Sequence, residues 1–229
     1  MRESGILMHI TSLPAPYGIG TMGKDAYAFV DFLVRAGQRY WQILPLTPTG
    51  YGDSPYQSLG ACAGNHYLID LDRLADEGLL KKEEIQNIPW GSNPARVDFG
   101  AMYAHRMNVL RLAFQRFTPD GAYETFVEQN RNWLEDYALF TALKDTLGGK
   151  PWLDWPEALR LRKADALTEK RRELSDEIRL QYFVQYEFDR QWKALRSYAN
   201  AKGVRIIGDV PIYVPLDSAD VWANPELFQ

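Results

Sequence analysis

The sequence predicts an α/β protein in which a parallel sheet begins near the N-terminus and a large helical insertion separates its second and third strands. Two observations lead to this prediction. Apolar runs bounded by chain breakers at 5–10, 40–44 and 204–210 are typical of short buried strands. Helical periodicity fills the stretch between the first two runs and most of 72–200. Because a strand, a helix and a strand follow one another, we expect the strands to be parallel.

Each element has local signals of its own. GILMHI (5–10) is predicted as the first strand, and YWQIL (40–44) is predicted as the second, stopped by Pro45. Between them a helix is predicted over 24–36, with Gly37 as its C-cap. The apolar positions that predict this helix are Ala26, Val30, Leu33 and Val34.

The insertion is predicted to consist of several helices. Helices are expected over 101–117 and 123–147, and a Trp- and Pro-rich break follows at 151–159. One long helix is then predicted over 166–201, before VRIIGDV (204–210) forms the third strand. The expected core stripes are Met107, Leu110, Phe114 and Phe117 in the first helix, and Leu180, Val184, Phe188, Trp192, Leu195 and Ala199 in the last.

Composition excludes several classes of function. The formal net charge of −4 argues against a general nucleic-acid binder, and the basic run at 170–172 has acidic neighbours, so we interpret it as a solvated helix face. Cys62 is the single cysteine, which fits a reducing compartment, and ACAG around it offers no nearby base for a catalytic thiol. No apolar run reaches the ~18 residues of a membrane helix. We therefore expect a cytoplasmic protein with no membrane partner, no metal and no cofactor.

The stretch YGIGTMG (17–23) matches the glycine pattern of dinucleotide sites. In those sites the glycines follow the first strand directly, and an acidic residue ends the second strand. Here TSLPAPY separates the strand from Gly18, and the second strand ends in Pro45 without an acid. A glycine-rich turn that leads into the first helix is therefore the favoured interpretation, and a dinucleotide enzyme ranks as a remote alternative.

Two loops rich in aromatic and polar residues follow the second and third strands, where α/β enzymes place their chemistry. The first contains GYGDSPYQS, and the second begins at Asp209. Aromatic rings cover the apolar face of a sugar, and carboxylates and hydroxyls hold its hydroxyl groups. If the second and third strands belong to one barrel, Asp209 and the loop that contains Tyr51, Asp53, Ser54 and Tyr56 open on the same face and form a sugar site. The second loop continues to Asp217, Asp220 and Trp222, and no firm role is assigned to Asp217 or Trp222.

Structural alternatives stand beside this interpretation. Asp53 could hold a turn, Asp209 could cap the loop that follows it, and Tyr56 could be a core residue. The three histidines, His9, His66 and His105, have no metal-ligand spacing.

Three long segments resemble the 4-α-glucanotransferases, a family also called amylomaltases or disproportionating enzymes, in the α-amylase-like clan of (β/α)8 barrels. They are GILMHITSLPAPYGIGTMG, LPLTPTGYGDSPYQSLGACAGNHYLIDLDRL and IIGDVPIYVPLDSADVWANPELF. The resemblance implies a partial (β/α)8 TIM-type barrel, with the later strands absent from the chain. It also implies three parts: 1–71 with the first strands and the glucan-binding loop, 72–175 as the helical insertion, and 176–229 with a barrel helix, the third strand and its loop.

The resemblance further implies an enzyme that transfers α-1,4-glucan segments between maltooligosaccharides by a retaining covalent mechanism. Tyr56 resembles the aromatic platform beneath the sugar at the scissile bond. Ser54 and Asp209 resemble further contacts in that sugar site, and Tyr51 resembles part of an outer glucan surface. The family's catalytic carboxylates match no residue of this chain, so we expect the chain alone to be inactive. A hydrolase of the same clan and a non-catalytic glucan-binding fragment are the alternatives.

Overall fold

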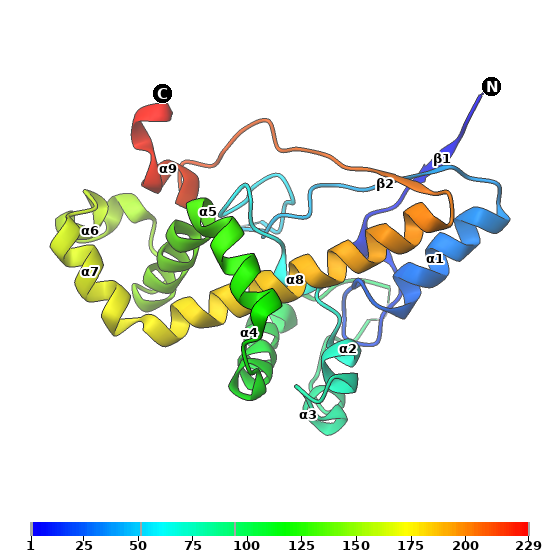
Figure 1. Ribbon diagram of the computed structural model, residues 1–229, viewed down its shortest axis with the longest axis horizontal. Helices are drawn as coiled ribbons and strands as arrows, with labels where there is room; N and C mark the ends of the chain where they lie inside the picture. The colour runs from blue at the N-terminus through cyan, green and yellow to red at the C-terminus, as the bar shows by residue number, and fades with distance from the viewer. Residues whose placement is uncertain (1, 51, 94, 229) are drawn as a thin grey trace. The chain divides into compact units, whose positions relative to one another are not determined.

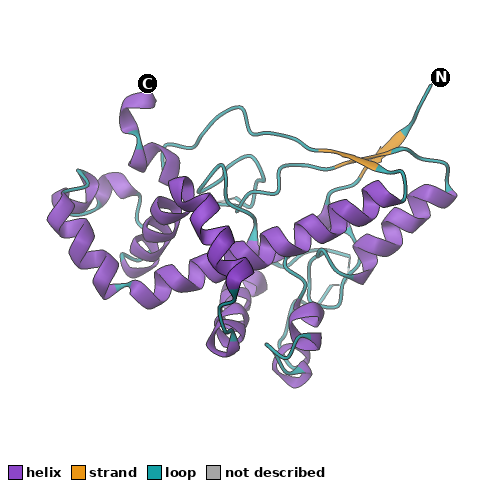
Figure 2. Ribbon diagram, viewed as in Figure 1, coloured by secondary structure: helices purple, strands orange, loops and turns teal. Residues whose placement is uncertain are grey.

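The computed structural model describes residues 2–50, 52–93 and 95–228. The fold is mixed α/β and mostly helical, with one three-stranded parallel sheet (Figure 2). The sheet contains β1 (Gly5–Leu7), β2 (Tyr40–Gln42) and β3 (Arg205–Ile207), in the order β1-β2-β3. All three predicted strands and their parallel pairing are therefore confirmed.

The strands are shorter than predicted, although the ladder continues just beyond them. The Met8 N–H donates to the Gln42 carbonyl at 3.0 Å, and the Ile43 N–H donates to the Ile207 carbonyl at 3.0 Å. After Met8 the chain turns into a short 3-10 helix, η1 (Ile10–Ser12), so the first apolar run ends as a helical turn. Ile10, the last apolar residue of the run, is fully buried although it lies outside the sheet.

Most of the predicted helices form, with some changes. The helices are α1 (Lys24–Arg35), α2 (Leu71–Asp76), α3 (Lys82–Gln86), α4 (Phe99–Arg116), α5 (Gly121–Thr146), α6 (Glu157–Arg160), α7 (Ala164–Glu173), α8 (Ser175–Ala201) and α9 (Ala219–Ala223). Further 3-10 turns are η2 (His66–Leu68), η3 (Trp152–Asp154) and η4 (Pro225–Leu227).

Two predictions within the helical region were wrong. The single helix expected over 166–201 is broken at Leu174, whose side chain is buried in one core together with Leu167 and Ile178. The core stripe expected on α4 is also displaced, because only Leu110 of that set is buried. The buried face of α4 instead contains Met102, Arg106, Val109, Leu110 and Ala113.

The chain forms two compact units, each made of three segments. Unit 1 contains residues 1–46, 65–118 and 187–210, and unit 2 contains 47–64, 119–186 and 211–229. The division into three parts at 71 and 175 stays a prediction.

Unit 1 contains the sheet. Trp41 on β2 is fully buried, and its indole N–H donates to the Met8 carbonyl at 2.7 Å. The buried face of α1 covers this core, and α1 lies beside the C-terminal end of α8 (Figure 1). The rings of Tyr27 and Tyr198, 4.9 Å apart, join these two helices. Gly37 follows α1 with a φ of +70°, in keeping with its predicted role.

The glycines at 17–23 allow a backbone conformation and close contacts in unit 1 that other residues could not adopt. Gly18 has a φ of +78°, which side chains rarely adopt. A Cβ on Gly20 would lie 1.9 Å from the Ile10 carbonyl oxygen, so no side chain fits there. Gly23 is the N-cap of α1, and a Cβ there would lie 2.0 Å from a carboxylate oxygen of Asp70. The glycines therefore lead into α1, as predicted, and η1 separates them from β1.

Within the described ranges, every helix is too short or too polar to span a lipid bilayer.

Candidate functional site

The segment after β2 forms a hairpin loop, defined here as residues 47–64. At its base, in unit 1, the Asn65 N–H donates to the Leu46 carbonyl at 2.7 Å. Inside the loop Thr49 and Ser58 form an antiparallel bridge, and the Gly50 N–H donates to the Gln57 carbonyl at 2.9 Å. These contacts give the loop a fixed backbone path although it is long.

The tip of the hairpin loop presents Tyr56 to solvent. The Tyr56 side chain is 44% exposed, so the alternative that it belongs to the core is wrong. The Ser54 hydroxyl accepts a hydrogen bond from the Tyr56 N–H at 3.3 Å, an ST-type turn that fixes the backbone beneath the ring. Asp53 has a φ of +57° and its N–H donates to the Gly50 carbonyl, so Asp53 does form part of a turn. The predicted contact residue Tyr51 lies outside the described residues.

Asp209 lies two residues beyond the carboxyl end of β3 and is exposed. Its carboxylate accepts a hydrogen bond from the Val210 N–H at 2.8 Å, as the capping alternative expects. Asp209 belongs to unit 1 and Tyr56 to unit 2, and their convergence on one site stays a prediction.

Two residues of the second predicted cluster serve the structure of unit 2. The Asp217 carboxylate accepts hydrogen bonds from the Lys144 ammonium at 2.5 Å and from the Trp152 N–H at 3.2 Å. The Trp222 side chain is fully buried, with the Arg162 guanidinium 4.3 Å from its ring centroid. The sequence assigned no firm role to these two residues, and the structure shows that the buried indole and the paired carboxylate are committed to packing.

The second arm of the hairpin loop is held by Gln185, which the sequence analysis missed, and by Asp220, which it named in the second loop. The Gln185 side chain on α8 accepts from the Gly64 N–H at 2.7 Å and donates to the Gly64 carbonyl at 3.0 Å. The Asp220 carboxylate on α9 accepts from the Ala61 N–H at 2.9 Å. A polar residue within a helical apolar stripe, such as Gln185, was the available signal.

Ionisable groups of the described chain show no activated nucleophile or metal centre. Partial burial, followed by the charge of Asp220, raises the pKa of the Cys62 thiol, the opposite of what a nucleophilic thiolate needs. Burial lowers the pKa of His9 to about 4 and that of His66 to about 3, with Arg106 adding to the shift at His66. Among the residues that the structure describes, no group of three or more His, Cys, Asp or Glu side chains could hold a metal ion.

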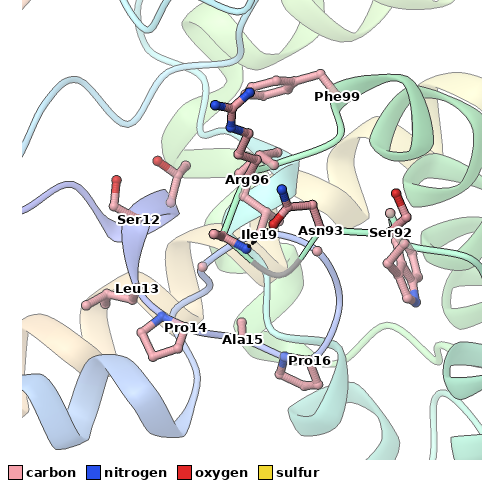
Figure 3. Close-up of a pocket in the computed structure, with 17 residues that line it drawn as sticks. Ser12, Leu13, Pro14, Ala15, Pro16, Ile19, Ser92, Asn93, Arg96 and Phe99 are labelled. Carbon is pink, nitrogen blue, oxygen red and sulfur yellow. Dashed lines mark hydrogen bonds between the residues drawn. The ribbon is translucent and has the colours of Figure 1, made fainter.

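Unit 1 has a separate hollow of about 640 Å³ between the loop after η1 and the loop before α4. Pro14, Ala15 and Pro16 follow one another along one side, and Arg96 and Phe99 stand opposite them in this view (Figure 3). Ser54, Tyr56 and Asp209 are not among the described residues that line it.

A parallel sheet whose strands are followed by loops rich in aromatic and acidic residues is typical of α/β enzymes, which carry their active sites in such loops. Comparison with known proteins agrees with this class. A sequence model described as 4-alpha-glucanotransferase matches residues 8–229. The chain therefore belongs to the 4-alpha-glucanotransferase family.

Individual relatives support the assignment. The 4-alpha-glucanotransferase of Thermus thermophilus is 51% identical over 99% of this chain and 46% of its own length. That of Clostridium butyricum is 48% identical over 96% of this chain and 46% of its own length. The structure of the amylomaltase of Streptococcus agalactiae in complex with acarbose matches with a TM-score of 0.96 and 48% identity, covering 100% of this chain and 47% of that one. The chain thus spans about half the length of the relatives it matches.

Proposed function

We propose that residues 1–229 form the N-terminal part of a 4-α-glucanotransferase that transfers α-1,4-glucan segments between maltooligosaccharides. The observation that carries the proposal is the family match across residues 8–229, together with the exposed tyrosine on the hairpin loop. The three strands would be the first strands of a (β/α)8 barrel, with later strands supplied by a part of the protein beyond residue 229.

In this proposal Tyr56 is the platform on which a glucose ring stacks, and Ser54 shapes the turn and contacts the same sugar. Tyr51 contributes to an outer glucan surface. Asp209 binds sugar hydroxyls without acting as the nucleophile. A flat aromatic ring and a carboxylate suit an α-glucan, because each glucose presents an apolar C–H face and a rim of hydroxyl groups.

The chemistry is proposed to proceed with retention of configuration. One carboxylate attacks the anomeric carbon, a protonated carboxyl group donates its proton to the departing 4-hydroxyl, and a covalent glucosyl-enzyme forms. The incoming sugar 4-hydroxyl then gives its proton to the carboxylate that acted as the acid, its oxygen bonds to the anomeric carbon, and the nucleophilic carboxylate leaves. This mechanism needs two carboxyl groups about 5–5.5 Å apart. The proposal places that pair beyond residue 229, so residues 1–229 alone should be inactive.

Product analysis on maltotriose tests the proposal in the full-length protein. Transfer yields glucose together with longer maltooligosaccharides, and hydrolysis yields only shorter chains. The second outcome would assign a hydrolase of the same clan.

The same assay is run on a protein that consists of residues 1–229 alone, for comparison with the full-length protein. If this chain is itself the natural product and binds maltooligosaccharide without changing it, a non-catalytic glucan-binding module is the correct assignment. Turnover of maltotriose by the chain alone would overturn the proposed location of the carboxylates.

A further inference from the structure

We infer that Gln185 and Asp220 are positioning residues for the sugar platform, and that the helices of unit 2 hold the hairpin loop in its sugar-binding shape. The inference rests on the proposed function, because it concerns the same site. It adds a role for side chains that touch no sugar and act through the loop backbone.

The Gln185 amide pairs with both backbone polar groups of Gly64, as a neighbouring strand would. The side chain of Gln185 is 2% exposed and Gly64 is buried, so these two hydrogen bonds lie away from water. A buried amide costs free energy unless it is paired, and here the pairing fixes the loop against α8. Because the Gln185 amide both donates and accepts, it fixes the orientation of the Gly64 backbone. An apolar side chain of similar size could not do this.

A second anchor lies three residues earlier in the loop. The Ala61 N–H donates to the Asp220 carboxylate, and the Ala219 N–H donates to the Leu59 carbonyl at 2.9 Å. The buried Ser218 caps the short helix α9, with its hydroxyl accepting from the Val221 N–H at 3.3 Å. Two hydrogen bonds, one at Leu59 and one at Ala61, therefore join this arm of the hairpin loop to the start of α9.

Packing leaves this part of the loop little freedom to shift. A Cβ on Gly60 would lie 2.6 Å from the ring of Tyr137 on α5, which is buried. The Ser58 hydroxyl donates to the Gly60 carbonyl at 2.8 Å and accepts from the Gly60 N–H at 3.1 Å. Only a few residues separate these contacts from Tyr56, so a displaced anchor moves the tip.

The chain supplies a matched control for Gln185. Gln191, farther along α8, accepts from the Asp70 N–H at 2.7 Å and donates to the Asp70 carbonyl at 3.4 Å, and it is fully buried. This pair lies in unit 1 and holds no part of the hairpin loop. Gln185→Leu and Gln191→Leu each remove two buried hydrogen bonds of the same kind, so similar losses of stability are expected from both.

The activity test uses the full-length protein with maltotriose. Gln185→Leu is expected to raise KM about tenfold while kcat changes less, because positioning errors near 1 Å have large effects. Gln191→Leu should leave KM at the wild-type value. Asp220→Ala should raise KM, and Asp220→Asn, which keeps an oxygen acceptor for the Ala61 N–H, should restore it. Equal KM values for the two glutamine variants would overturn the inference.

A spectroscopic test separates this inference from the proposed function. Cys62 is the single cysteine of residues 1–229, lies in the loop beside both anchors and is exposed. With any cysteine beyond residue 229 replaced by serine, a nitroxide label attached to Cys62 reports loop mobility. Gln185→Leu should increase the mobility of the label, and Gln191→Leu should not. If the label responds in this way and the protein has no glucan activity, the proposed function fails and the anchoring stands. If the label mobility is unchanged in Gln185→Leu, the anchoring is wrong whatever the activity.

Discussion

Truncation of Tyr56 to alanine tests the platform, and the structure sets the size of the effect. An aromatic side chain offers about 150–250 Å² of surface to its contacts. The 44% of Tyr56 that is exposed then corresponds to about 65–110 Å². Covering that area with a sugar is worth about 1.6–2.7 kcal/mol at ~25 cal/mol per Å².

This free energy corresponds to a loss of about 15- to 100-fold in affinity. Calorimetric titration of the full-length protein with acarbose or maltoheptaose measures it. The free energy of unfolding should fall by less than about 1 kcal/mol, because the ring is exposed at a loop tip. Tyr56→Phe should bind almost as tightly as wild type, since its ring face is retained.

Phe32 on α1 provides the matched control, because it is also 44% exposed. Phe32→Ala should leave glucan affinity unchanged. The reasoning fails if Tyr56→Ala binds the glucan as tightly as wild type. It also fails if Tyr56→Ala lowers the melting temperature as a core substitution does.

Other perturbations address the scaffold. Trp222→Phe removes the indole hydrogen bond to the Leu159 carbonyl, 3.1 Å long, and weakens the cation contact, so a loss of about 2–4 kcal/mol in urea unfolding is expected. Gly60→Ala forces a methyl group against the ring of Tyr137 and should cost about 1–3 kcal/mol, with faster hydrogen exchange across the hairpin loop. Protonation of His9 and His66 is disfavoured in the folded state, so stability should fall as the pH drops below about 6.5.

The direction of the pH effect follows from proton counting. Unfolded histidine binds its proton near pH 6.5, whereas folded His9 stays neutral to about pH 4. The unfolded state therefore takes up more protons in this window and is stabilised there relative to the folded state. His9→Gln should flatten the dependence of the urea midpoint between pH 7.5 and 5, and an unchanged slope would contradict this account.

Much of the fold could be predicted because its signals are local. Apolar runs and breakers identified all three strands, and the four-residue apolar spacing together with Gly37 identified α1. The stripe predicted on α8 is buried or half-buried throughout, because one helix face had to be apolar to pack. The loops after β2 and β3 were also predicted, and Tyr56 and Asp209 lie on them in exposed positions.

Local patterns did not show which side chains would satisfy which backbone groups. The apolar run at 67–71 has the composition of a short strand, but it contains the end of η2 and the first residue of α2. Its carbonyl groups find a partner in the buried Arg106, which donates to the Tyr67 carbonyl at 2.9 Å and to the Ile69 carbonyl. A strand ladder was therefore unnecessary in this segment.

The sequence by itself determined the α/β class, the parallel strands, the family and the loops that would carry a sugar site. The tertiary structure alone decided the roles of Asp217 and Trp222, and the partnership of Gln185 with Gly64. Gln185 and Gly64 are 121 positions apart along the chain. Such partnerships depend on which surfaces pack together, and the free energy of pairing a buried polar group appears only once the partner is in place.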